Sequence, residues 1–307
     1  MKRLALTFFG CIGLGVALVG TGCNRSERTA DPAAAIRFAF VPQTDMEERY
    51  AGAYRALQAY MAPRLSRPVE IVQLDDANAA IEGLRAGKLD VCNFSPWPFL
   101  IAEKKAGLEA LLLPMAPGGE PISYHSVLVT HPATGLRTPE DMVRRARELT
   151  FAFEEPVSTS GHFAPRTYLH SLGVSPEKDF KRVLYGTDGV TNLLATRAGR
   201  LDVAALSDTS LQRAIARGRI RDGEIVVLWK SPPILSTVIA VRAGLPEALK
   251  EKIARLLIDL PAASPTHWAE VLKQYSNPIA GYLPVPPAAL DSFRRALRDV
   301  PGLQLSP

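Results

Sequence analysis

Residues 85–91 read RAGKLDV, and residues 197–203 read RAGRLDV, 112 positions further along the chain. In each copy, apolar residues at helical spacing precede the phrase, a glycine ends the helix, and a short apolar run follows. These runs are LDVCNF at 89–94 and LDVAAL at 201–206, and both are typical of buried strands. The chain is therefore predicted to contain one α/β unit twice, the alternative being chance recurrence of a common helix end.

The agreement between the two copies continues past the strands. Ser95 falls at the place of Ser207, and each serine is followed by a predicted helix. A strand that feeds a helix through a tight turn places the start of that helix beyond the carboxyl end of the sheet, where α/β proteins bind ligands. The two units predict either two such sites or one site shared by two lobes.

The remaining sequence shows the βαβ rhythm of two α/β blocks. Strands are expected at 36–41, 69–74, 89–94 and 109–114 in the first block and at 149–153, 182–186, 201–206 and 225–229 in the second. Helices are expected near 245–260, 264–274 and 286–298, returning to the first lobe.

Two apolar strands, at 124–131 and 236–243, lie between the blocks and are expected to cross from lobe to lobe as a hinge. We therefore assign residues 36–126 and 240–307 to lobe 1 and residues 127–239 to lobe 2.

The first residues indicate export from the cytoplasm. Lys2 and Arg3 precede an apolar run at 4–19 that is too short to span a bilayer, and the run closes on Cys23 in the phrase VGTGC. This pattern predicts a lipoprotein signal at 1–23, a lipid on Cys23, and a flexible tether at 24–35. Ordinary cleavage is the alternative, because lipoprotein sites usually carry leucine where this chain has Gly20.

Charge and cysteine content exclude several classes of protein. Loss of Lys2 and Arg3 with the signal lowers the formal charge from +5 to +3, and the remaining basic residues are scattered, so no nucleic-acid surface is expected. Cys92 is then the only cysteine in the folded part, which allows no internal disulfide. Its place in a strand-like run predicts a buried, inert thiol.

The stretch FEEPVSTSGHFAPRTYLHSLG at 153–173 holds the strongest candidate site. A strand ends near its start, a hydroxyl-rich loop follows, and a helix is expected from about His162. Ser158, Thr159, Ser160 and the Gly161 amide then gather at a helix N-terminus, which favours an anion, and His162 adds a further donor. The alternative is that one hydroxyl caps the helix while the others face water.

Catalytic and metal motifs find little support. A hydrolase would use Ser160 as nucleophile and His162 as base, but two positions apart on one loop they point different ways, and no G-x-S-x-G elbow occurs. GLRAGK at 83–88 lacks the spacing of a phosphate-binding loop. The five histidines show no metal-binding spacing, so neither a metal nor a cofactor is expected.

Five stretches together resemble the substrate-binding proteins of phosphate, phosphite and phosphonate ABC transporters. They are FAFVPQ, LDVCNFSPWPFLIA, STSGHFAPRTYL, LYGTDGVTNLLATRAGRLDVAALSD and VLWKSPPI. The resemblance implies a type II periplasmic-binding-protein fold, with two α/β lobes on a two-strand hinge that close over a small ligand without a chemical step.

The resemblance also implies a set of binding residues. Hydroxyls and a histidine would hold the oxyanion, Asp208 would meet the amino end of an aminoalkyl phosphonate, and Trp97 would either line the cleft or pack between the lobes. The full set is Tyr124, Ser126, Thr159, Ser160, His162, Asp208, Ser95 and Trp97.

The implied partners follow from the family. They are a small anionic ligand, an ABC transporter permease, and the membrane through a lipid anchor, with the protein a monomer in the periplasm or at the cell surface. The alternative is a ligand-sensing lipoprotein of the same fold that signals to a membrane partner and binds a ligand without phosphorus.

Overall fold

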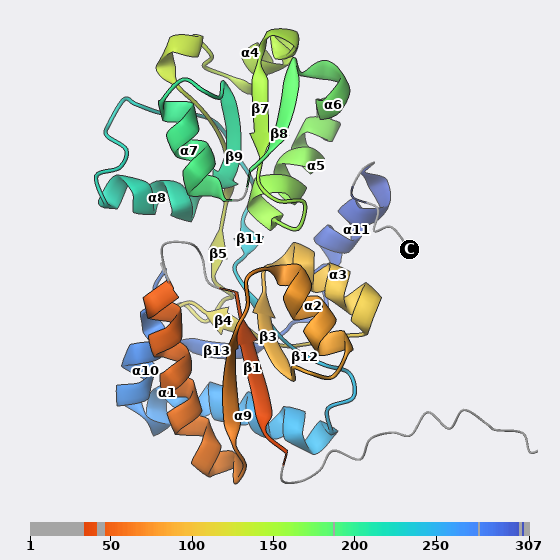
Figure 1. Cartoon of the computed structure of the whole chain (residues 1–307), viewed down its shortest axis with the longest axis vertical. Helices are drawn as coiled ribbons and strands as arrows, with labels where there is room; N and C mark the ends of the chain where they lie inside the picture. The colour runs from red at the N-terminus through yellow and green to blue at the C-terminus, as the bar shows by residue number, and fades with distance from the viewer. Residues whose placement is uncertain (1–33, 42–46, 187, 276, 301–302, 304–307) are drawn as a thin grey trace, which may run out of the picture.

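The computed structural model describes residues 34–41, 47–186, 188–275, 277–300 and 303, which form two stacked α/β lobes (Figure 1). The predicted signal, Cys23 and nearly all of the predicted tether lie outside the described residues. Within the described part of the chain, no helix combines the length and apolar character needed to cross a membrane.

Lobe 1 is built on a six-stranded sheet in the order β13-β4-β12-β3-β1-β2. Strands β1, β2 and β3 are parallel, and β12 lies antiparallel between β3 and β4. The strand bounds are β1 Ile36–Phe40, β2 Val69–Gln73, β3 Val91–Phe94, β4 Glu109–Met115, β12 Val238–Val241 and β13 Gly281–Pro284.

Helices cover both faces of this sheet, and one buried core lies on each side. One face carries α1 Glu47–Leu65, α9 Glu247–Ala263 and α10 Pro265–Leu272; the other carries α2 Ala77–Arg85, α3 Pro96–Ala106 and α11 Asp291–Asp299. The expected strands of the first block are all present. Strand β13 was not predicted, since GYLP is short and proline-flanked and becomes a strand only by pairing with β4.

Lobe 2 repeats the arrangement with a five-stranded sheet in the order β10-β6-β9-β7-β8. Strand β7 lies parallel between β8 and β9, and β6 pairs antiparallel with β9. The strand bounds are β6 Ser126–Thr130, β7 Thr150–Phe153, β8 Arg182–Tyr185, β9 Val203–Ser207 and β10 Val226–Lys230. The order β8-β7-β9-β6 in lobe 2 therefore corresponds to β2-β1-β3-β12 in lobe 1.

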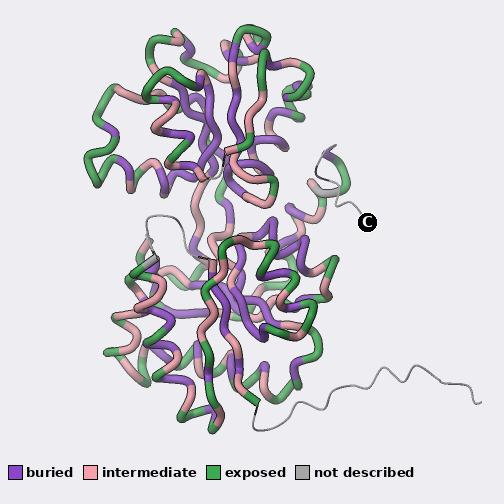
Figure 2. Tube along the Cα trace, viewed as in Figure 1, coloured by how far each residue is buried: buried purple, intermediate pink, exposed green. Residues whose placement is uncertain are grey.

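The helices of lobe 2 also divide between two faces, and the buried residues form a core on each side of the sheet (Figure 2). Helices α4 Pro139–Arg144, α5 Ala164–Ser171 and α6 Pro176–Asp179 cover one face, and α7 Gly189–Arg197 and α8 Asp208–Ala216 cover the other. Short helical turns lie at Pro132–Thr134, Ala146–Glu148 and Thr159–Phe163, the last of these being η3.

The lobes are joined by a separate two-stranded sheet, β5 Ser123–Tyr124 and β11 Ile234–Leu235 (Figure 1). The strands expected to cross, at 124–131 and 236–243, instead join the two large sheets as β6 and β12, where every residue is buried. The predicted two-strand hinge is present, but its strands lie a few residues before the expected ones, because long apolar strands gain more from burial in a sheet than from an exposed crossing. The predicted boundaries at 126/127 and 239/240 fall inside these strands and stay a prediction.

The duplicated phrase performs the same structural task in both lobes. Gly87 and Gly199 end their helices in the left-handed region, with φ of 67° and 69°. The Arg37 amide of β1 donates to the Asp90 carboxylate at 2.8 Å, and the Thr150 amide of β7 donates to Asp202 at the same distance. Each repeated aspartate, just before β3 or β9, therefore ties its own strand to the neighbouring parallel strand, β1 or β7.

Candidate ligand-binding cleft

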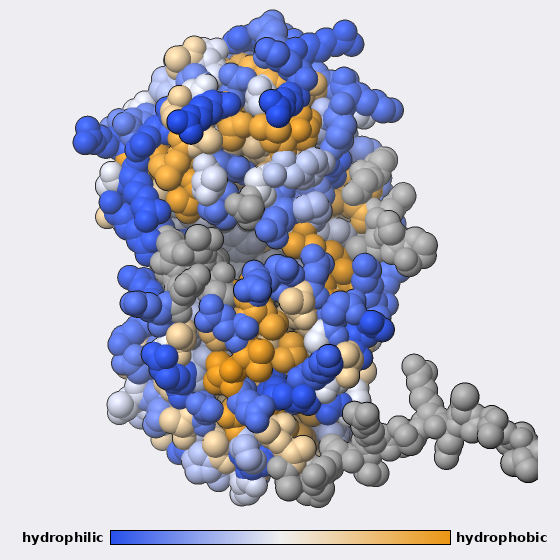
Figure 3. Space-filling model, viewed as in Figure 1, coloured by the Kyte–Doolittle hydropathy of each residue, from blue (hydrophilic) through white to orange (hydrophobic). Residues whose placement is uncertain are grey.

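A cavity of about 660 Å³ lies between the two lobes, where the molecular surface is hollowed in Figure 3. Five helical segments begin at this cavity, namely α2, α3, η3, α7 and α8. The first N–H groups of a helix lack partners within the helix and its dipole is positive at that end, so each start favours negative charge. Their convergence makes the cleft a place for a small anion.

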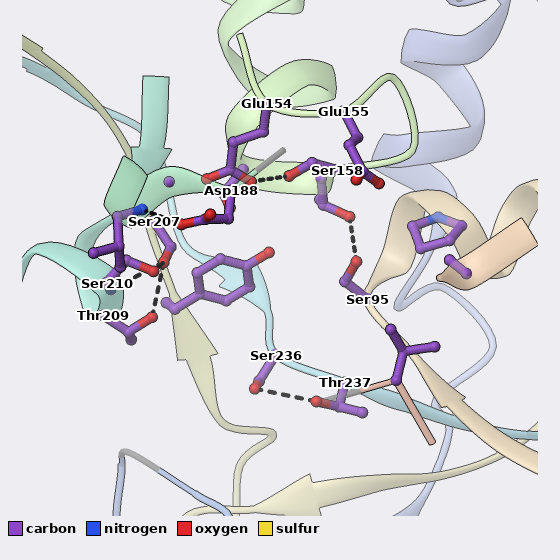
Figure 4. A pocket seen from close by; sticks show the side chains of 18 of the residues that line it. Ser95, Glu154, Glu155, Ser158, Asp188, Ser207, Thr209, Ser210, Ser236 and Thr237 are labelled. Carbon is purple, nitrogen blue, oxygen red and sulfur yellow. Dashed lines mark hydrogen bonds between the residues drawn. The ribbon is translucent and has the colours of Figure 1, made fainter. Parts of the chain in front are cut away.

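Hydroxyl groups make up much of the wall of the cleft (Figure 4). A hydroxyl both donates and accepts hydrogen bonds, so it can turn to suit the oxygen atoms of a bound anion. The hydroxyl residues that line it are Tyr50, Ser95, Tyr124, Ser158, Thr159, Ser160, Thr191, Ser207, Thr209, Ser210, Ser236, Thr237 and Tyr275.

The STSG loop begins its helix earlier than predicted. Segment η3 starts at Thr159, three residues before His162, and Ser158 is its N-cap, accepting the Gly161 amide at 3.0 Å. The capping alternative therefore holds for Ser158. Ser160 lines the cleft and is 6% exposed.

Thr159 joins the two lobes across the cleft. Its hydroxyl accepts the backbone N–H of Trp97 at 3.0 Å and donates to Ser95 Oγ at 2.9 Å. The Trp97 indole N–H donates to the Pro156 carbonyl at 2.8 Å, and the ring packs against Phe163 with 4.8 Å between centroids. Trp97 therefore packs between the lobes, which was one of its two predicted roles, and it does not line the cleft.

His162 also lies away from the cleft. It is 5% exposed, its Nε2 accepts from Arg166 Nε at 3.1 Å, and its ring meets Phe153 edge-on. Burial, reinforced by the Arg166 charge, lowers the pKa of His162 to about 4, so the ring stays neutral near pH 7. With η3 starting at Thr159, the His162 ring faces the sheet and does not line the cleft, so a contact between His162 and the ligand stays a prediction.

Two further predicted binding residues lie behind the wall. Ser126 is fully buried, and its hydroxyl donates to the Ser160 carbonyl at 2.6 Å, so it supports the loop. Asp208 accepts the His125 amide at 3.0 Å and lies 3.4 Å from Lys230 Nζ. Neither lines the cleft, and Asp208 already has a cationic partner. Of the eight predicted residues, the structure brings Ser95, Tyr124, Thr159 and Ser160 together there.

The cleft contains acidic residues that the sequence analysis did not assign to the site. Two of them cap helices: Asp76 accepts the Ala79 amide at 2.9 Å, and Asp188 accepts the amides of Val190 and Thr191 at 2.9 Å. Their spacing of 112 matches the duplicated phrase and could have revealed this shared role. The charged residues lining the cleft are Asp75, Asp76, Glu154, Glu155, Asp188, Arg213 and Arg219.

Other reactive groups give no second candidate site. Among the described residues, no three histidine, cysteine or acidic side chains gather closely enough to hold a metal ion. Cys92 is buried, as predicted, and burial raises the pKa of its thiol to about 12. A thiol that stays protonated is a poor nucleophile.

Two α/β lobes, a two-stranded connection and an interlobe cleft lined by helix starts define a class of proteins that bind small ligands between lobes. Residues 38–289 match the family described as the periplasmic substrate-binding protein of phosphonate ABC transporters, and the chain belongs to this family. This confirms the resemblance seen in the sequence. The family is one of binding proteins, which agrees with the prediction that the chain is not an enzyme.

Two relatives carry names that concern phosphorus compounds. The chain is 28% identical over 193 residues to the phosphonates-binding periplasmic protein of Escherichia coli, a match covering 63% of this chain and 56% of that protein. It is 25% identical over 254 residues to the phosphate-import protein PhnD of Mycolicibacterium smegmatis, covering 78% and 77%.

Solved structures share the fold. A binding protein component of an ABC phosphonate transporter from Pseudomonas aeruginosa superposes with a TM-score of 0.72 at 23% identity, covering 86% of this chain and 85% of that one. PhnD1 from Prochlorococcus marinus, in complex with methylphosphonate, gives 0.71 at 16% identity, covering 88% and 98%. These likenesses confirm the two-lobed type II fold.

Proposed function

We propose that this chain binds a small phosphorus oxyanion in the interlobe cleft and delivers it to the permease of an ABC importer. The observation that carries the proposal is the convergence of five helix starts on one hydroxyl-lined cavity. Phosphonate, phosphite and phosphate all offer oxygen atoms that accept from N–H and O–H groups, as such a cavity requires. The family and the two named relatives support the same ligand class.

Ser160, Ser95 and Tyr124 are the side chains that we assign to the oxyanion. Ser160 comes from lobe 2, Ser95 from lobe 1, and Tyr124 from the connection between them. Burial raises the pKa of Tyr124 far above its ordinary value, so its phenol remains a donor at any physiological pH. In this proposal Thr159 sets the distance between the lobes through its bonds to Trp97 and Ser95.

The proposal extends to the setting of the protein. Lipidation of Cys23 would hold a periplasmic monomer at the membrane, and the tether at 24–35 would let the two lobes reach the permease. Electrophoretic mobility and mass of the exported protein test the anchor: a diacylglyceryl group on Cys23 is expected, and a mature chain lacking it would contradict this part.

A thermal-shift panel tests the ligand class. The chain from Asn24 onward is heated with phosphate, phosphite, hypophosphite, methylphosphonate, 2-aminoethylphosphonate, sulfate and several amino acids. A ligand at about 100 times its Kd adds about 2.7 kcal/mol of stability, which raises the Tm by several degrees. We expect a phosphorus oxyanion to give the largest shift, whereas a shift with none of them would favour a sensor with another ligand.

A matched pair of variants tests the site. Ser160→Ala should weaken phosphorus-oxyanion binding about 10- to 100-fold through the loss of one hydrogen bond to a charged group. Ser171→Ala removes a hydroxyl at the far end of α5, where it donates to the Tyr168 carbonyl, and should leave the affinity unchanged. Equal affinities for Ser160→Ala and wild type would contradict the site assignment.

A further inference from the structure

Glu154 places a carboxyl group inside the proposed anion site. It follows strand β7, and its Oε2 accepts from the Ser158 hydroxyl at 2.6 Å (Figure 4). Its backbone N–H donates to the Gly161 carbonyl at 2.9 Å, which holds the residue against the first turn of η3. Glu154 also lines the cleft, so this carboxyl group lies beside the hydroxyls that we assign to the ligand.

Two glycines make room for this side chain. A Cβ atom at Gly161 would overlap the Glu154 side chain, and a Cβ atom at Gly189 would overlap its Oε1. Gly161 belongs to η3 and Gly189 is the first residue of α7. The carboxyl group therefore lies between the starts of two helices, where a bound anion would also be most stable.

The surroundings of Glu154 make its charge costly. Burial raises the pKa of Glu154 to about 7; the Ser158 hydroxyl opposes this, Asp188 and Glu155 reinforce it, and Arg213 opposes it. The other charged residues lining the cleft are Asp75, Asp76 and Arg219. Two acidic groups at short range cannot both ionise without strong repulsion, and such pairs hold one proton between them.

We propose that Glu154 and the bound oxyanion share one proton, so that the cleft selects tetrahedral anions able to carry a proton over fully ionised anions of the same shape. The proposal rests on the proposed function and specifies its ligand class. A phosphonate monoanion brings the proton as P–OH and donates it to the Glu154 carboxylate. A sulfonate has no such proton and binds only after Glu154 has taken one from water.

Methylphosphonate and methanesulfonate make a matched pair of probes for calorimetric titration. In the wild type, methanesulfonate affinity should fall about tenfold per pH unit once the pH exceeds about 7, because only protonated Glu154 can donate to it. Methylphosphonate affinity should fall less over the same interval, since this ligand supplies a proton. At about pH 8.5 the wild type should therefore prefer methylphosphonate several-fold, because either Glu154 or the ligand can hold the shared proton.

Glu154→Gln separates proton sharing from simple charge. The side-chain amide that this variant carries would donate to either anion at every pH, so methanesulfonate binding should lose its pH dependence and the preference for methylphosphonate at about pH 8.5 should largely disappear. Glu155→Gln removes the same charge from the next residue, whose side chain extends in another direction in Figure 4. Because Glu155 reinforces the raised pKa of Glu154, this variant should move the fall in methanesulfonate affinity to slightly lower pH, but it should keep the preference for methylphosphonate.

A second variant guards against misfolding of Glu154→Gln. Ser158→Ala removes the hydrogen bond that favours ionised Glu154, so the fall in methanesulfonate affinity should move to higher pH. Identical pH dependence for the two probes in the wild type, or equal effects of Glu154→Gln and Glu155→Gln, would overturn proton sharing and leave the proposed function intact. Absence of methylphosphonate and phosphate binding at every pH would overturn both.

Discussion

The two copies of the repeated unit end in the same serine, and the two serines do different work. Ser207 Oγ accepts the Ser210 amide at 3.0 Å and so caps its own helix, α8. Ser95, at the equivalent place before α3, makes no such bond and accepts instead from Thr159 of the other lobe. The strand-to-helix turn at Ser207 therefore stabilises only its own helix, whereas the turn at Ser95 connects the two lobes. We call these two turns the corners.

The difference comes from two prolines. An N-cap hydroxyl accepts from the amide two or three positions further on, and three positions after Ser95 stands Pro98, which has no N–H. Pro96 removes another donor, and the remaining N–H, that of Trp97, donates to Thr159. The prolines therefore leave the Ser95 hydroxyl free to bond to the opposite lobe. The two copies of the repeated sequence thus have different roles.

The largest expected effect comes from replacing Trp97. Trp97→Ala removes a side chain that is 3% exposed and should lower the free energy of unfolding by about 3–5 kcal/mol. Thr209, at the equivalent place in the other copy, is only partly buried, so Thr209→Ala should cost less than about 1 kcal/mol. Urea denaturation measures both, and equal losses would contradict the asymmetry.

The residues that follow the equivalent strands β1 and β7 provide a second comparison. Glu154 follows β7 where the equivalent position after β1 holds Val41, and both line the cleft. A carboxyl group whose pKa is raised in the folded state destabilises that state once the pH exceeds the unfolded value, and the full loss is present above about pH 7.

Glu154→Gln should therefore be more stable than the wild type by about 3 kcal/mol at about pH 8.5, and the difference should vanish near about pH 4. Thermal unfolding across this interval measures it. A stability difference that does not change with pH would refute the raised pKa of Glu154.

The smallest expected effect concerns the serines themselves. Ser207→Ala should lower the free energy of unfolding by about 1 kcal/mol, the usual value of a lost N-cap. Ser95→Ala loses no cap, so its cost to stability should be smaller and its main effect should be weaker ligand binding. Urea denaturation and calorimetric titration of both variants measure these effects. If Ser95→Ala lost as much stability as Ser207→Ala, the two serines would not differ in role.

Much of the fold can be predicted from local sequence, but which side chains line the cleft cannot. Apolar runs and glycine stops placed eight expected strands within about two residues, because periodicity and turn residues are local signals. The STSG loop was likewise found from its hydroxyls. Which side chains of η3 face the cleft depends on the residue at which η3 begins. Because it begins at Thr159, the His162 side chain faces the sheet.

Residues brought in by tertiary packing were harder to predict. Ser126 is the first residue of β6 and Asp208 the first residue of α8, yet they bond to the Ser160 carbonyl and the His125 amide behind the wall of the cleft. Glu154 precedes the loop as an ordinary acidic residue, and only the space at Gly161 and Gly189 brings it to the helix starts.

The central claim is that the two lobes form one shared site, and the stoichiometry of binding tests it most directly. Calorimetric titration of methylphosphonate into the chain from Asn24 onward should give one ligand per chain, with Ser95→Ala in lobe 1 and Ser160→Ala in lobe 2 each weakening that single event about tenfold or more. Two ligands per chain, or an affinity that responds to the lobe 2 variant alone, would contradict a site shared between the lobes.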